Sequence, residues 1–176
     1  MTEALRLTGP VRAVCFDWGG TLMSEAGPED TPMGRWPQVT AVPGAGACLA
    51  ALAGGPPLCI ATNASVSGRA MIERALDRVG LLGYFSHIFC YTEIGARKSE
   101  AAFWHVVRDR LGVPLEAVAM VGDSLENDCL APRRFGVQGV WFDRLGQGGG
   151  RIAADVPRVQ HLVDFAGAVR AAGATA

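Results

Sequence analysis

Short apolar runs alternate with longer amphipathic segments along the whole chain. The apolar runs have the length and composition of buried strands and lie at 11–17, 57–62, 88–92, 117–122 and 138–142. The segments between them have helical spacing and lie at 44–53, 65–79, 99–111 and 125–135, with a last helix near 161–172. Strands that alternate with helices predict a parallel sheet with right-handed crossovers. We therefore expect an α/β fold, a three-layer Rossmann-like parallel sheet with helices on both faces.

Two segments fall outside this alternation. Residues 22–43 contain four prolines and follow the first expected strand, which predicts a loop or flap. The glycine-rich stretch at 146–150 predicts a connection to the last helix. Because neither segment has the length of a second domain, we expect a single domain over residues 1–176.

The composition excludes several classes of protein. Of the 176 residues, 49% are hydrophobic and 19% are charged, as in folded globular proteins. The net charge of −1 gives no field that would attract nucleic acid or an anionic membrane. No apolar stretch reaches the ~20 residues that span a bilayer, and the N-terminus lacks the pattern of a secretion signal. We expect no nucleic-acid or membrane partner and a cytoplasmic location.

Two residue counts add detail. The five cysteines show no CxxC spacing, so we expect them to fill the core rather than form disulfides or a zinc site. The sixteen basic residues are fifteen arginines and one lysine, Lys98. A chain that uses arginine almost everywhere points to a specific role for its one lysine.

Polar side chains follow several of the expected strands at the point where each strand ends. Because the carboxyl ends of parallel strands share one edge of a sheet, these residues can converge there. Carboxylates with a lysine and a hydroxyl suit Mg²⁺ and a phosphoryl group, and an aspartate can act as a covalent nucleophile. The candidates are Asp17, Thr62, Asn63, Lys98, Asp123 and Asp128.

Each candidate also has an ordinary structural explanation. Asp17 could cap a turn at the end of its strand, while Thr62 and Asp123 could cap the helices that follow them. Asp128 and Lys98 could be solvated surface residues. The residue types alone leave these alternatives open.

Four segments, taken together, resemble the motifs of one enzyme family in order and in spacing. They are Asp17-Trp18-Gly19-Gly20-Thr21, Leu58-Cys59-Ile60-Ala61-Thr62, Gly95-Ala96-Arg97-Lys98 and Val121-Gly122-Asp123-Ser124-Leu125-Glu126-Asn127-Asp128. Over about 11–145 the chain resembles the haloacid dehalogenase (HAD) superfamily, whose members are mostly Mg²⁺-dependent aspartyl-phosphate phosphatases. Its first motif, DWGGT, is a variant of the family pattern DxDx[TV]. The short 22–43 flap, in place of a cap domain, resembles the subclass with a minimal cap or none.

The resemblance implies a role for each candidate residue. Asp17 would attack phosphorus, and its carboxylate would bind Mg²⁺ together with Asp123 and the backbone carbonyl of Gly19. Asp128 would hold the metal directly or through another ligand. The phosphoryl oxygens would be held by Thr62, Asn63 and Lys98, with Thr62 and Lys98 also serving catalysis. The implied substrate is a phosphorylated small molecule or a macromolecular phosphate.

Gly19 is the departure from the family pattern that matters most. In the family's phosphatases an aspartate at this position protonates the leaving group and later activates water. General acid–base catalysis of this kind raises the rate by about 10²–10⁴-fold. Glycine cannot do this, so we expect slow turnover or a restriction to good leaving groups. Glu25, Glu29 or Asp30 of the flap could replace the missing acid, and Gly19→Asp is expected to raise activity if only this acid is missing.

Other functions stay open at this point. The chain could be a catalytically impaired relative that binds a phosphate or a partner protein. A dehalogenase-like or phosphonatase-like hydrolase is a further alternative, because phosphonoacetaldehyde hydrolases carry a similar DWAGT-like motif. Their chemistry needs a Schiff-base lysine from a cap, however, and no lysine lies between Thr21 and Lys98. Without a cap, a second protomer could close the site, so a homodimer is one expected arrangement.

Overall fold

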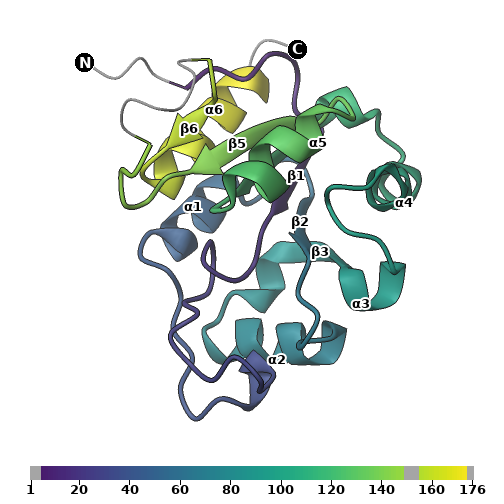
Figure 1. The fold of residues 1–176 in the computed structure, drawn as a ribbon. Coiled ribbons are helices and arrows are strands. Elements are labelled where there is room, and N and C mark those ends of the chain that lie inside the picture. The colour runs from purple at the N-terminus through teal and green to yellow at the C-terminus, as the bar shows by residue number, and fades with distance from the viewer. Residues whose placement is uncertain (1–4, 149–154, 174–176) are drawn as a thin grey trace.

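The computed structural model describes residues 5–148 and 155–173, and a six-stranded parallel sheet lies at its centre (Figure 1). The strand order is β3-β2-β1-β4-β5-β6, and every neighbouring pair is parallel. The strands are β1 Ala13–Phe16, β2 Leu58–Thr62, β3 Phe85–Cys90, β4 Val118–Gly122, β5 Gln138–Phe142 and β6 Arg158–Val159. The predicted fold class is confirmed. Only the two-residue β6, too short to form a hydrophobic pattern, was not expected.

The helices are α1 Ala45–Leu52, α2 Arg69–Arg78, α3 Tyr91–Ile94, α4 Ala101–Leu111, α5 Ala131–Arg133 and α6 Leu162–Gly173. Three differ from the sequence-based expectation. The short α3 was not expected, and it begins where a strand was predicted to continue to residue 92. The helix expected at 125–135 is a π-helical turn over Leu125–Leu130 followed by the short α5. The helix expected from 65 begins only at Arg69, because the backbone of Gly68 just before it is extended. Ser67 instead ties this segment to the flap, since its hydroxyl accepts the Met33 amide at 3.1 Å. Residues 149 and 150 of the expected glycine-rich connection lie outside the described residues.

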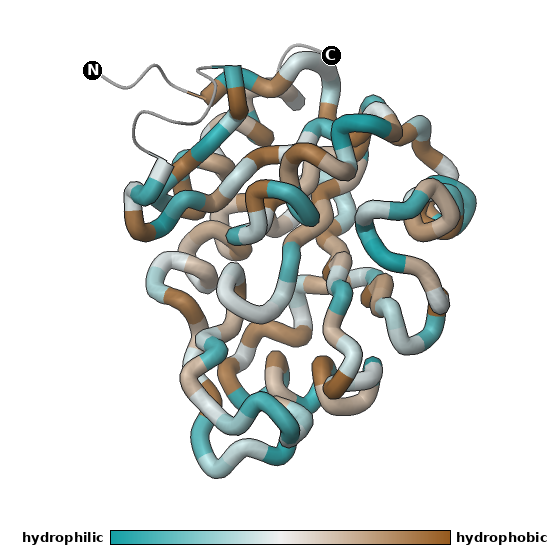
Figure 2. Tube along the Cα trace, viewed as in Figure 1, coloured by the Kyte–Doolittle hydropathy of each residue, from teal (hydrophilic) through white to brown (hydrophobic). Residues whose placement is uncertain are grey.

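Alternate side chains of the central strand fill two separate cores. Val14 and Phe16 of β1 point into a core shared with α1 and α6, where Phe165 packs edge-on against Phe16. Ala13 and Cys15 point to the opposite face, which is covered by α4 (Figure 1). Figure 2 shows the hydrophobic residues concentrated in the interior strands and the hydrophilic ones in the outer loops. Of the described helices, none has both the length and the hydropathy needed to cross a bilayer.

The 22–43 flap is tied to the rest of the protein at several points. Its 3-10 turn, Met33–Arg35, packs on α2. Arg78 of α2 donates hydrogen bonds to the carbonyls of Trp36 and Pro37, at 2.7 and 2.9 Å. Met23 forms β-bridges with both Gly19 and Ala41. The flap therefore starts and ends close to the carboxyl end of β1.

The strand order places that carboxyl end at the centre of one edge of the sheet. From β1 the chain proceeds outward to β2 and β3, then returns to β4 on the other side of β1. Such a reversal leaves a crevice at the carboxyl ends of the two central strands, where open α/β sheets bind ligands. The Asp17 amide donates to the carbonyl of Val121 at 2.9 Å and holds β1 and β4 together up to this crevice.

Candidate active site

Asp17 directly follows β1 and is held by two side chains. Its Oδ1 accepts a hydrogen bond from Lys98 Nζ at 2.8 Å, and its Oδ2 accepts one from the Thr21 hydroxyl at 3.0 Å. The carboxylate is buried except for a small exposed part. No backbone N–H in the described ranges donates to it, so the carboxylate does not cap a turn. Its orientation is set by side chains from other parts of the sheet edge.

Lys98 lies in the interior of the protein, with an exposed fraction of only 2%. Its Nζ donates to Asp17 Oδ1, to Asp128 Oδ1 at 2.6 Å and to the Ala61 carbonyl at 3.0 Å, which uses all three ammonium hydrogens. Burial lowers the pKa of Lys98, but the charges of Asp128 and Asp17 outweigh that effect and raise it. The surface interpretation of this lysine is therefore wrong, and its contacts neutralise two carboxylates.

Asp128 and Asp123 reach the crevice from the segment after β4. Asp128 belongs to the π-helical turn and is 1% exposed, so it is not a surface residue. Its Oδ2 accepts the amide of Ser124 at 2.9 Å. The N-cap of this turn is Ser124, whose hydroxyl accepts the Asn127 amide, and not Asp123. The Asp123 carboxylate is thus free of a capping role and is exposed to the crevice.

Glycines make room for the acidic side chains at this site. A Cβ atom at Gly20, whose φ is +77°, would overlap the carboxylate of Asp123. One at Gly122 would overlap the carboxylate of Asp128 in the same way. At both positions the carboxylate occupies the space that the side chain of a larger residue would take. Both glycines are required by close approach.

Thr21 is a residue whose importance the sequence did not reveal beyond its place in the first motif. Its hydroxyl donates to Asp17 and accepts the Asp123 amide at 3.0 Å, so one side chain links the ends of β1 and β4. It is fully buried. Apart from that motif, the sequence signal for this role of Thr21 is a hydroxyl residue four positions after an acid at a strand end.

Thr62 and Asn63 lie at the end of β2, next to the same crevice. The Thr62 hydroxyl accepts the Ala64 amide at 3.0 Å, and Asn63 Oδ1 accepts the Lys98 amide at 2.9 Å. A cavity of about 230 Å³ is lined by these two residues together with the other predicted site residues, Asp17, Gly19, Lys98, Asp123 and Asp128. The sheet edge therefore brings together all of the candidates selected from the sequence.

The three aspartates form a cluster that could hold a metal ion. One carboxylate oxygen from each of Asp17, Asp123 and Asp128 lies within 4.8 Å of the others. With Lys98 as the ammonium group between them, the cluster has two negative charges in excess when ionised. Burial, with the charge of Asp17 as the next cause, raises the pKa of Asp123 to about 7 and that of Asp128 to about 6. An all-oxygen site with excess negative charge fits a hard divalent cation such as Mg²⁺.

Comparison with known proteins identifies the family and supports the fold. The family model described as haloacid dehalogenase-like hydrolase matches residues 33–136. Among solved structures, an uncharacterized protein from Listeria monocytogenes serotype 4b superposes with a TM-score of 0.79 at 22% identity, over 92% of this chain and 98% of that one. That likeness supports the fold.

Two curated proteins are similar in sequence. The (S)-2-haloacid dehalogenase 2 of Pseudomonas sp. (strain CBS-3) is 26% identical over 66% of this chain and 52% of its own length. The pyrimidine 5'-nucleotidase YjjG of Escherichia coli (strain K12) is 30% identical over 59% of this chain and 45% of its own length. The chain spans about half the length of these relatives. Because the family model covers more than half of the chain, the protein belongs to the haloacid dehalogenase-like hydrolases.

Proposed function

We propose that the protein is a Mg²⁺-dependent phosphohydrolase that forms an aspartyl-phosphate on Asp17. The observation that carries the proposal is the position of this carboxylate. It is oriented by Lys98 and Thr21, lies in a carboxylate cluster, and lines a cavity at the sheet edge. A fixed carboxylate next to a site for a divalent cation is suited to attack on a phosphoryl group.

The proposed reaction has two displacements at phosphorus. A carboxylate oxygen of Asp17 forms a bond to phosphorus while the bond to the leaving oxygen breaks. Water then attacks the phosphorus of the aspartyl-phosphate, which releases inorganic phosphate and restores the Asp17 carboxylate. Thr62, Asn63 and Lys98 are the residues proposed to hold the phosphoryl oxygens during both steps. For Lys98, a phosphoryl oxygen would replace one of the three acceptors that its ammonium group now contacts.

Mg²⁺ is the proposed cofactor, held by Asp17, Asp123 and the Gly19 carbonyl, with Asp128 beside them. When bound, it would neutralise charge on the phosphoryl oxygens and on the crowded carboxylates. The donor set supports this choice, because carboxylate and carbonyl oxygens are the ligands that Mg²⁺ takes in proteins. The substrate is proposed to be a phosphorylated small molecule, in keeping with a cavity of modest size.

The first test compares the two reactions suggested by the names of the relatives. Phosphate release from p-nitrophenyl phosphate is measured with MgCl₂ and with EDTA, and chloride release from 2-chloropropionate is measured under the same conditions. We expect phosphate release that requires Mg²⁺, and no chloride release. Chloride release without phosphate release would support the dehalogenase-like alternative. Mg²⁺-dependent binding of a phosphate analogue such as vanadate, without turnover, would instead indicate a binding protein.

A pH-dependent response to Mg²⁺ is expected from the raised pKa values of Asp123 and Asp128. Between about pH 4 and 7 the metal-free folded protein binds more protons than the unfolded chain, so its free energy of unfolding falls as the pH rises. Mg²⁺ must displace those protons, so the rise in Tm that it causes should be small at pH 5 and fully developed above about pH 7.5. Thermal unfolding at several pH values, with and without MgCl₂, measures this.

The Asp123→Asn variant is the control for this prediction. Because its amide carries no titratable proton, the variant should lose the part of the pH dependence that lies near pH 7 and should bind Mg²⁺ more weakly. An equal Mg²⁺-induced shift in Tm at pH 5 and pH 8 in the unchanged protein would contradict the proposed ligand set.

A further inference from the structure

The carboxylate of the flap residue Glu25 lies where a side chain at position 19 would begin. A Cβ atom built on Gly19 would overlap Glu25 Oε1 and would lie 3.0 Å from Cδ and 3.2 Å from Cγ. Glu25 is exposed, and its carboxylate has no hydrogen-bond or ion-pair partner among the described residues, whereas its backbone carbonyl accepts the Gly27 amide at 2.9 Å. Its side chain therefore approaches the end of β1 without being held there by another side chain.

The backbone of the flap accounts for this approach. The Gly20 amide donates to the carbonyl of Met23 at 2.8 Å, and Met23 also pairs with Gly19 in a β-bridge. One residue further, the Ser24 amide donates to the carbonyl of Thr40 at 2.9 Å. Met23 and Ser24, the two residues just before Glu25, are thus held by backbone contacts to the first motif and to the end of the flap. These contacts keep Glu25 next to the first motif.

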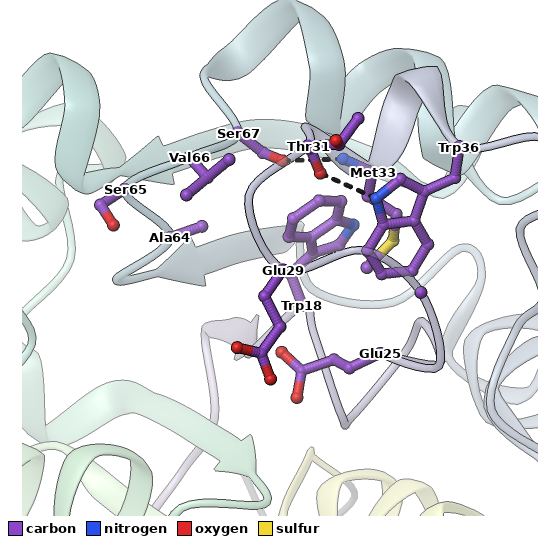
Figure 3. A pocket seen from close by; sticks show the side chains of 11 residues that line it. Trp18, Glu25, Glu29, Thr31, Met33, Trp36, Ala64, Ser65, Val66 and Ser67 are labelled. Carbon is purple, nitrogen blue, oxygen red and sulfur yellow. Dashed lines mark hydrogen bonds between the residues drawn. The ribbon is translucent and has the colours of Figure 1, made fainter.

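Glu25 also lines three cavities. One is the cavity over Asp17, and another, of about 420 Å³, lies beside Asp123. The third, of about 300 Å³, shares Trp18 as well as Glu25 with the cavity over Asp17, and we call it the Trp18–Trp36 pocket. Besides the two tryptophans, that pocket is lined by the apolar Met33 and Val66, by a second acid, Glu29, and by hydroxyl side chains of the flap and of the segment before α2. Figure 3 shows the carboxylates of Glu25 and Glu29 close together at one side of the pocket, below the ring of Trp18. Glu29 does not line the cavity over Asp17, and Asp30 lines none of the three.

We propose that Glu25 supplies the acid that position 19 lacks, and that the leaving group it protonates occupies the Trp18–Trp36 pocket. This inference rests on the proposed phosphohydrolase function. In the first step the proton of the Glu25 carboxyl passes to the leaving oxygen as the bond from that oxygen to phosphorus breaks, and the alcohol departs. In the second step the Glu25 carboxylate takes a proton from the water that attacks the aspartyl-phosphate. The proton gained in the second step replaces the one given in the first.

The pocket also indicates a class of substrate. Its aromatic and apolar walls suit an apolar or aromatic alcohol, and the residues that line it include two carboxylates but no lysine or arginine. Like charges placed together across an interface are unfavourable. The substrate class is therefore a phosphate monoester of an apolar or aromatic alcohol that carries no second negative charge.

The Glu25→Gln variant tests the acid with two kinds of leaving group. On 2-phenylethyl phosphate, whose alkoxide must be protonated, kcat should fall by about 10²–10⁴-fold. On p-nitrophenyl phosphate the first step needs no proton, but the second still needs a base. We therefore expect a burst of about one nitrophenol per protein followed by slow turnover, with aspartyl-phosphate accumulating on the protein. A residue that only supports the fold would not produce a burst.

Two further variants sharpen the test. Asp30→Asn removes a neighbouring flap carboxylate and should leave kcat unchanged on both substrates. The double variant Gly19→Asp with Glu25→Gln should show no burst, and its kcat should be at least about tenfold higher than that of Glu25→Gln. In Gly19→Asp alone the new side chain would collide with the flexible end of Glu25, so the gain in rate should be smaller than if an acid were simply missing from the site. This revises the gain expected from the sequence.

The results that overturn the proposal are distinct from those that overturn the proposed function. Unchanged kinetics of Glu25→Gln, or an equal loss on both substrates without a burst, would show that Glu25 is not the acid. A wild-type protein that releases no phosphate from either substrate would overturn the phosphohydrolase function and this inference with it. For the pocket, kcat/KM should be at least about tenfold higher for 2-phenylethyl phosphate than for 3-phosphoglycerate. A ratio near one would overturn the assignment of the leaving group.

Discussion

Replacing Asp17 by Asn is expected to reduce Mg²⁺-dependent phosphate release by roughly 10⁴-fold or more, as the loss of a catalytic nucleophile does. The amide has nearly the same shape but cannot form the aspartyl-phosphate. Its carbonyl oxygen can still accept the hydrogen bond from Lys98. Phosphate release from p-nitrophenyl phosphate, together with mass spectrometry of the acid-quenched protein, measures both the rate and the phosphorylated intermediate.

The fold should survive this substitution, which makes the result interpretable. Asp128 remains as a charged partner for Lys98, and the variant relieves part of the excess negative charge among the three aspartates. We therefore expect a free energy of unfolding equal to or above that of the unchanged protein. Retained activity in Asp17→Asn, or a phosphorylated residue other than Asp17, would place the nucleophile elsewhere.

Replacing Lys98 by Met is expected to lower the free energy of unfolding by about 3–5 kcal/mol at pH 7.5 without metal. The substitution keeps the apolar volume but leaves Asp17 and Asp128 buried without their shared ammonium group. The loss should be smaller at pH 5, where protonation of Asp128, whose pKa burial raises to about 6, removes part of the uncompensated charge. Urea unfolding at both pH values measures the effect, and phosphate release should be lost as well.

Arg134→Met is the matched control for Lys98→Met. Arg134 pairs with Glu126 at the same short distance of 2.6 Å, but both side chains are more than half exposed. An exposed pair of this kind contributes less than about 1 kcal/mol. Equal losses in the two variants would mean that Lys98 does not hold the buried carboxylates together.

The sequence by itself determined the architecture and the composition of the site. Continuous apolar runs separated by helical segments can bury their surface only as a parallel sheet covered on both faces, and that sheet is present. Strand ends then place Asp17, Thr62 and Asp123 on one edge, because parallel strands share a direction. The exceptions are local. The π-helical turn at Leu125–Leu130 has no distinct hydrophobic pattern, so it could not be told from an α-helix.

Only the tertiary structure decided what each polar residue does. The sequence left Lys98 and Asp128 with surface alternatives, and these are removed by burial, which depends on residues distant along the chain. The same holds for Glu25. Nothing in the sequence favoured one of the three flap acids as the replacement acid. In the structure Glu25 approaches Gly19, because backbone hydrogen bonds hold the chain just before it. Periodicity reports which face of an element is buried, whereas the distance between two side chains depends on how the elements pack together.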